Sequence, residues 1–180
     1  MTNGKASANV LAIHLGWAQQ YDGQHPVEGG ASPPNYYGES SAFAEAEDGL
    51  FHCGVDRGEV GGQRNHPRME NQGIDYLFIS KNPDSDNWEV VGLYRRASTD
   101  MISYYSGNNL IDNWVRVKAP RNQTVELLGS QRIALPDHLR PGRPMRLWLK
   151  TFGKDVSKYP ELAGPLLDAY AKIVAMYHVP

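Results

Sequence analysis

Aromatic side chains that lie among glycine, proline and asparagine are the residues of this sequence best suited to contact a ligand. Trp17 and Tyr21 follow an apolar run, and Tyr36 and Tyr37 follow two prolines. Loops carried by a rigid sheet are where binding residues collect. A flat ring in such a loop can stack on a nucleobase, which is worth about 1–3 kcal/mol per base. The alternative is that each tyrosine closes one end of a sheet with its hydroxyl group in water.

Positive charge is concentrated in one part of the chain. The formal net charge is −2, but residues 1–94 carry a net charge of −8 and residues 95–150 carry +6. Eight of the ten basic residues in that second segment are arginines. The planar guanidinium group matches phosphate groups and base edges better than the ammonium group of lysine does. The segment is therefore compatible with a nucleic-acid surface, and a solvated face would show the same pattern.

Motifs for covalent or phosphoryl chemistry do not occur in the sequence. It contains no G-x-S-x-G nucleophile motif, no G-x-x-x-x-G-K-[ST] phosphate loop and no G-x-G-x-x-G dinucleotide motif. Cys53 is the single cysteine, and His52 beside it would point to the opposite face of a strand, so the two would not converge on a metal. We therefore expect a binding domain without catalytic residues, metal or cofactor.

Alternating and continuous apolar runs predict a protein made mostly of strands. Residues 74–81 and 88–95 flank the turn-forming sequence NPDSDN and predict a β-hairpin. Apolar residues at helical spacing predict a C-terminal helix over residues 165–177, and a stretch rich in alanine and serine predicts a shorter helix over 36–47. Further strands are predicted over residues 10–15, 50–55, 114–118, 124–128 and 145–150.

Together these elements predict one α+β domain with a curved or barrel-like, mostly antiparallel sheet, a few flanking helices and a C-terminal helix. A chain of 180 residues suffices for a single core over residues 10–180, preceded by a disordered tail at residues 1–9. The tail lacks the apolar segment of a signal peptide and a single cysteine fits a reducing compartment, so we expect a cytoplasmic protein. No run of about 18 apolar residues occurs, so no membrane partner is expected.

Three segments, taken in order, resemble a known family. Residues 10–23 place Gly-Trp directly after a strand and Tyr-x-Gly shortly afterwards. Residues 37–55 contain Tyr-Gly-Glu, Asp-Gly and Phe-His-Cys-Gly-Val, and residues 75–95 form paired strands that return through Val-Gly-x-Tyr. The order resembles modified-base readers of the PUA-like superfamily (EVE, YTH and SRA-type domains), as found at the N-terminus of HNH-associated modification-dependent restriction endonucleases. One departure is that Glu39 and Ser40 stand where a His-Glu pair is expected.

The resemblance implies a DNA-binding domain that recognises 5-methyl- or 5-hydroxymethylcytosine in double-stranded DNA. Such readers turn the base out of the helix into an aromatic pocket, and stacking and edge hydrogen bonds offset the cost of a few kcal/mol. The domain would be the specificity module of a modification-dependent (type IV) restriction system, with cleavage in a separate HNH nuclease domain or subunit. Carried over to this sequence, the base pocket would consist of Trp17, Tyr21, Asn35, Tyr36, Tyr37, Glu39, Ser40 and Trp88. The phosphate contacts would come from Arg95, Arg96, Arg116, Lys118 and Arg121.

Three other functions remain open from the sequence. The same fold could read RNA or N6-methyladenine instead of modified cytosine. A small-molecule-binding barrel or an enzyme could use His14, His52 and Glu39 as acid–base groups. Its binding would be indifferent to salt, whereas phosphate contacts weaken steeply as salt rises. A protein-interaction domain could use its tyrosines as interface anchors.

Overall fold

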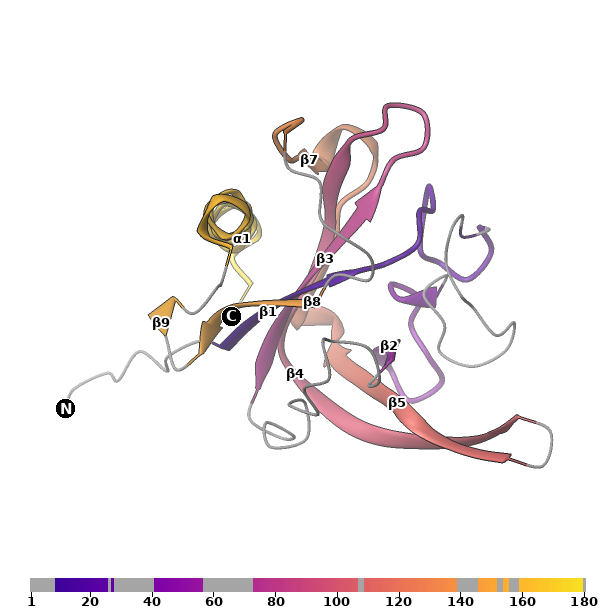
Figure 1. Ribbon diagram of the computed structural model, residues 1–180. Coiled ribbons are helices and arrows are strands. Elements are labelled where there is room, and N and C mark those ends of the chain that lie inside the picture. The colour runs from indigo at the N-terminus through magenta and orange to yellow at the C-terminus, as the bar shows by residue number, and fades with distance from the viewer. Residues whose placement is uncertain are drawn as a thin grey trace.

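The architecture is a mixed β-sheet with one α-helix packed on one of its faces (Figure 1). The computed structural model describes residues 9–25, 27, 41–56, 73–106, 109–138, 146–151, 154–155 and 159–179. Within them, nine strands form the sheet in the order β2-β5-β4-β3-β1-β8-β9, and β6 and β7 also pair with β4. The strands are β1 (Asn9–His14), β2 (Leu50–Asp56), β3 (Ile74–Lys81), β4 (Trp88–Ser106), β5 (Asn109–Pro120), β6 (Thr124–Glu126), β7 (Ile133–Ala134), β8 (Arg146–Thr151) and β9 (Lys154–Asp155). The helices are the 3-10 turns η3 (Arg121–Gln123) and η4 (Gly129–Gln131) and the α-helix α1 (Pro160–Tyr177).

The α+β class and the predicted strands are confirmed. β3 has the predicted bounds and forms an antiparallel hairpin with the first half of β4. β1 pairs in parallel with β3, and the other strand pairs are antiparallel. α1 begins at Pro160, five residues before the predicted start: Pro160 takes the first-turn position that proline tolerates, and Pro165 lies inside the helix. No helix among the described residues combines the length and the apolar character needed to cross a membrane.

Two structural predictions are wrong in part. The sheet does not close into a barrel, since its order ends at β2 on one side and at β9 on the other among the described strands. The described part of the helix predicted over 36–47 holds no α-helix: Ser41 has 3-10 geometry, residues 42–47 make turns, and Glu45 bridges to Phe51. The tail predicted over 1–9 lies outside the described residues, except that Asn9 is already the first residue of β1.

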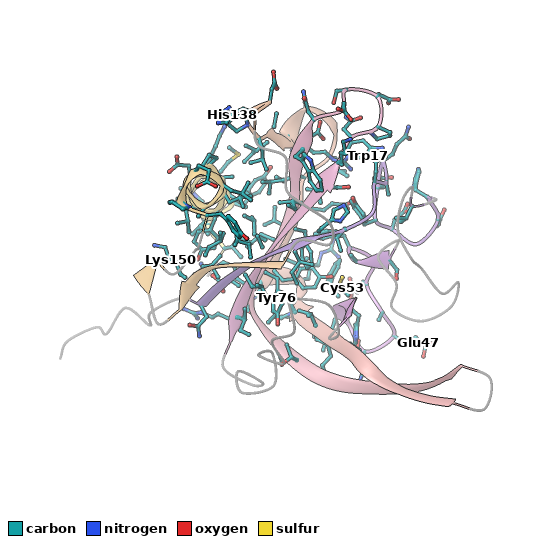
Figure 2. All side chains as sticks on the ribbon, in the orientation of Figure 1. Trp17, Glu47, Cys53, Tyr76, His138 and Lys150 are labelled. Atoms are coloured by element: carbon teal, nitrogen blue, oxygen red, sulfur yellow. The ribbon has the colours of Figure 1, made fainter. Side chains whose placement is uncertain are left out.

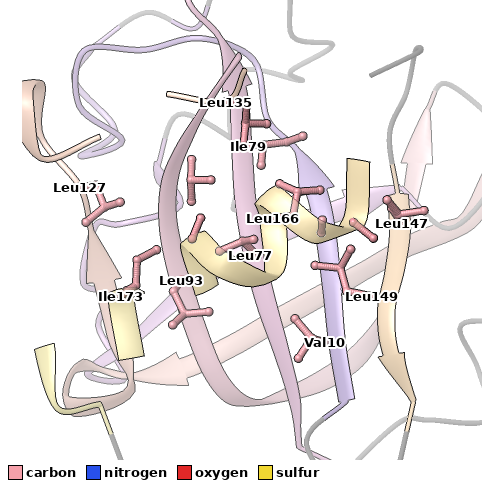
Figure 3. Close-up of a cluster of buried hydrophobic side chains, with 14 of the residues drawn as sticks. Val10, Leu77, Ile79, Leu93, Leu127, Leu135, Leu147, Leu149, Leu166 and Ile173 are labelled. Atoms are coloured by element: carbon pink, nitrogen blue, oxygen red, sulfur yellow. The ribbon is translucent and has the colours of Figure 1, made fainter. Parts of the chain in front are cut away.

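Both faces of the central strands are buried, each against its own apolar cluster. Val10 and Leu77 belong to the cluster between the sheet and α1, which also contains Leu166 and Ile173 of the helix (Figure 3). Their chain neighbours in β1 and β3 point the other way, into a second cluster that includes Phe78. Burial on both faces explains why these strands are continuous apolar runs in the sequence rather than alternating ones.

Hydrogen bonds at a bulge in β4 connect the sheet to α1. Asp75 of β3 faces both Arg95 and Arg96, because the register of the β3–β4 pair shifts there and Arg96 has a φ of 46°. The buried carboxylate of Asp75 accepts hydrogen bonds from the backbone N–H of Arg96 at 2.8 Å, from Nε of Arg95 at 3.2 Å and from the hydroxyl of Tyr170 at 2.6 Å. Arg95 also donates to the carbonyl of Val179. Beyond the bulge, β4 and β5 extend from the body as a long ribbon (Figure 1).

Candidate functional site

The segment after β1 carries the most exposed of the predicted aromatic wall residues that the structure describes. Trp17 is half-buried and lies where the chain leaves the sheet (Figure 2). Tyr21 is fully buried, and its hydroxyl donates to the carbonyl of Gly16 at 2.8 Å. Its own carbonyl accepts from the N–H of Phe43 at 2.8 Å. Tyr21 therefore stabilises the segment from within the core, whereas Trp17 is exposed enough to contact a ligand.

Arg132 holds this segment in place, and sequence reasoning did not select it. Its side chain is 4 % exposed, and its guanidinium carbon lies 4.3 Å from the centre of the Trp17 ring. Nη2 donates to the carbonyls of Ala18 at 2.7 Å and Gln19 at 2.9 Å, and Nε donates to the carbonyl of Leu127 at 3.1 Å. The donor and its acceptors after β1 are more than 110 residues apart in the chain, so no local motif could have linked them.

Two acidic residues, Glu126 and Asp22, belong to the same part of the structure as Trp17 and Arg132. Glu126 is half-buried, and its Oε1 accepts the backbone N–H of Tyr21 at 2.8 Å. Burial raises the pKa of Glu126 above its usual value, although the Tyr21 N–H and the charge of Arg132 act in the opposite direction. Asp22 accepts from the His25 ring at 2.9 Å, and this bond is the main reason that the pKa of Asp22 falls to about 2. Electrostatic interactions link Glu126 to Arg132, Asp22 and His25, and Arg132 contacts the Trp17 ring, so we call these five residues the Trp17 site.

Replacing Glu126 by glutamine is expected to make the stability of the domain less dependent on pH. A raised folded-state pKa means that protonated Glu126 suits the fold better than the ionised form does. Its contribution is fully present below the unfolded-state pKa and is lost as the pH rises through the folded-state pKa. The variant should therefore gain stability relative to the wild type between pH 4 and pH 7, as measured by urea unfolding at about these two values. If the difference in free energy of unfolding between variant and wild type is the same at both pH values, burial does not raise the pKa of Glu126.

The remaining predicted pocket residues do not join the Trp17 site in the described structure. Trp88 is 7 % exposed in the cluster beneath α1, and its ring meets that of His14 edge-on at 4.9 Å. It is therefore a core residue, and the pocket-wall role expected for it is not supported. The other five, Asn35, Tyr36, Tyr37, Glu39 and Ser40, lie outside the described residues.

The five predicted phosphate contacts divide into one internal residue and four on or near the surface. Arg95 is 15 % exposed and is bound to Asp75, which favours a structural role. Arg96 is exposed at the bulge, and Arg121 is 82 % exposed with Glu45 at 3.4 Å. The two others, Arg116 and Lys118, are half-buried on β5 and flank the buried residue Val117.

The histidines considered for acid–base chemistry engage different partners. His14 contacts the Trp88 ring, while Nε2 of His52 lies 2.9 Å from Oδ1 of Asp48. The His52 bond lowers the pKa of Asp48, so this carboxyl group is ionised at neutral pH. Cys53 is buried in the second cluster. Among the described residues, no three His, Cys, Asp or Glu side chains gather as a metal site requires.

Similarity to other proteins adds no assignment to this geometry. No protein-family description, curated protein or solved structure matches the chain. The site therefore has to be interpreted from its own residues.

Proposed function

We propose that this domain binds nucleic acid and reads a modified cytosine, with Trp17 stacking on the base. The observation that carries the proposal is the Trp17 ring itself, which is half-buried and has the buried guanidinium group of Arg132 at 4.3 Å from its centre. A ring that is already immobilised loses little conformational freedom when a ligand stacks on it. Such a ring suits the base-stacking role better than the fully buried Tyr21 does.

The carboxylate of Glu126 gives the proposed site a means to recognise the edge of a base. Its Oε1 accepts the N–H of Tyr21, only four residues after Trp17, and its half-buried position makes an added hydrogen bond stronger than in water. Carboxylates accept hydrogen bonds from the amino group of cytosine. A 5-methyl or 5-hydroxymethyl group, which phosphate contacts cannot sense, would be recognised through shape and apolar contact at the ring.

Four cationic side chains support binding to the nucleic-acid backbone in this proposal. They lie on β4, on β5 and at the start of η3, and they are Arg96, Arg116, Lys118 and Arg121. Contacts of this kind set affinity rather than base specificity, and they weaken with salt. We also propose a PUA-like fold, and a role as the specificity module of a restriction system whose nuclease is a separate domain or subunit.

Replacing Trp17 by alanine is expected to remove the preference for modified DNA. In this proposal only the modified cytosine is turned out onto the ring, so loss of that stacked base should lower the affinity for the modified duplex, and with it the ratio of the two affinities, by about 5–150-fold. Trp17→Phe keeps a flat ring and should retain most of the ratio. Fluorescence anisotropy with labelled duplexes measures both affinities. Lys118→Ala is the matched control, since it should weaken binding to both duplexes alike.

The same titrations separate the proposal from its alternatives. A preference for RNA, or for N6-methyladenine over modified cytosine, would keep the site and change its ligand. Undiminished discrimination by Trp17→Ala would show that the base is read elsewhere. Binding that is unaffected by salt would contradict the phosphate contacts.

A further inference from the structure

We propose that Arg132 is a positioning residue that holds the Trp17 ring in the conformation that receives the base. This inference rests on the proposed function for its ligand, but its structural part can be tested without any ligand. The first reason is the nature of its partners. The hydrogen bonds of the buried guanidinium go to the backbone carbonyls of Ala18, Gln19 and Leu127, and the nearest carboxylate contact is Glu89 Oε2 at 4.0 Å from Nη1.

The position of these carbonyls is the second reason. Ala18 and Gln19 directly follow Trp17, so the two bonds of Nη2 fix the backbone on the C-terminal side of the ring. The guanidinium carbon lies 4.3 Å from the ring centre, and so the side chain is held by the same group. One buried cation therefore constrains both the backbone and the ring of the base-stacking segment.

The chemistry of arginine is the third reason. Its planar group carries five N–H donors in fixed directions, which allows simultaneous bonds to three carbonyls and stacking on an aromatic face. Lysine keeps the positive charge but offers three donors on a compact ammonium group. Arg132→Lys therefore retains the charge while removing the geometry, and it separates positioning from simple electrostatic attraction.

A ligand-free measurement tests the positioning. The emission of Trp17 is obtained by subtracting the spectrum of Trp17→Phe from that of the wild type, and the same subtraction is made in an Arg132→Lys background. We expect Trp17 in the Arg132→Lys protein to show shifted emission and faster quenching by acrylamide, with cooperative unfolding retained. Arg121→Lys is the matched control, because Arg121 is 82 % exposed and should leave Trp17 unchanged. Unaltered emission and quenching in Arg132→Lys would overturn the inference.

A double-mutant cycle tests the consequence for binding. Arg132→Lys should reduce the preference for modified duplex by about 5–150-fold, as Trp17→Ala does, and leave binding to unmodified duplex unchanged. In the double variant no further loss is expected, because both changes disable one unit. Additive losses would overturn the inference, since a purely structural role would act independently of the ring.

Failure of the variant to fold and failure of the proposed function give different results. If Arg132→Lys does not fold, Arg132→Gln takes its place in both measurements. Because glutamine also removes the charge beside the ring, acrylamide quenching, which reports how exposed the ring is, then decides the positioning. If the wild type shows no preference for modified DNA, the proposed function fails. The emission and quenching measurements still decide whether Arg132 positions Trp17.

Discussion

Replacing Asp75 by alanine is expected to lower the free energy of unfolding by about 3–5 kcal/mol, because it removes one partner of a buried ion pair. Arg95, whose side chain is 15 % exposed, would lose its carboxylate. The N–H of Arg96 in the strained bulge and the hydroxyl of Tyr170 would lose their acceptor as well. Urea unfolding measures the change, and hydrogen exchange should show faster opening of α1 together with the bulge.

Two variants calibrate the Asp75 result. Tyr170→Phe removes a single hydrogen bond to the same carboxylate and should cost less, about 1.5–3 kcal/mol. Burial and the neighbouring Asp75 raise the pKa of the Tyr170 hydroxyl well above its usual value, so it remains a donor at neutral pH. Asp84→Ala, in the exposed turn between β3 and β4, should change stability by less than about 0.5 kcal/mol. A loss as small as this at Asp75 would contradict the structural role of the pair.

Replacing Gly92 by alanine is expected to destabilise the domain by about 3 kcal/mol, the upper end of the usual cost of overpacking. An added Cβ at this position of β4 would lie 2.2 Å from Cζ of Phe43 and 2.6 Å from the carbonyl oxygen of Val125. Neither neighbour can move easily. The Phe43 ring packs edge-on against Phe78 and Tyr94, and Val125 belongs to the paired strand β6.

Comparison variants identify the cause of the Gly92 effect. Gly164→Ala in α1 adds the same methyl group where no atom other than those of its chain neighbours and of the helix backbone lies within 4 Å. The following Pro165 disfavours a Cβ on helical backbone at this position, which offsets the helix-propensity gain of alanine, so the change in stability should be much smaller than at Gly92. Phe43→Leu in the Gly92→Ala background should restore part of the lost stability, since it removes the closest clash and leaves the one with Val125. Equal effects of alanine at Gly92 and Gly164 would contradict the close approach of the ring.

The sequence predicted the local elements well because their signals are local. The apolar run along β1 and the turn-forming residues between β3 and β4 depend on neighbours in the chain, and both elements form as predicted. The Val-Gly-x-Tyr motif also has a physical reason in this structure, because Gly92 makes room for the ring of Phe43. A glycine in a strand interior commonly marks such a close approach.

Features that depend on distant pairing could not be predicted. β4 was expected to end near residue 95 but continues to Ser106, because beyond the bulge at Arg96 its second half pairs with β5. The open order of the sheet likewise follows from which strands meet, rather than from any one segment. Tyr21 and Trp88 looked like ligand-binding aromatics, yet both are buried.

The candidate site also combines a residue that the sequence could predict with one that it could not. Trp17 could be selected from its place between a strand and a loop, but the contact with Arg132 joins positions more than 100 residues apart. Nothing in residues 127–132 marks Arg132 as different from the other arginines of the basic segment. Only its burial and its three backbone acceptors identify it.

The affinity ratio for two duplexes that differ only in one cytosine's C5 substituent tests the central claim most directly. Wild-type protein is titrated into each duplex at about 0.15 M salt, where exposed charges are substantially screened. Modified-base reading through the Trp17 site predicts tighter binding of the 5-methyl or 5-hydroxymethyl duplex, by about 5–150-fold if one stacked base carries the preference. Equal affinity for the modified and unmodified duplexes would contradict it.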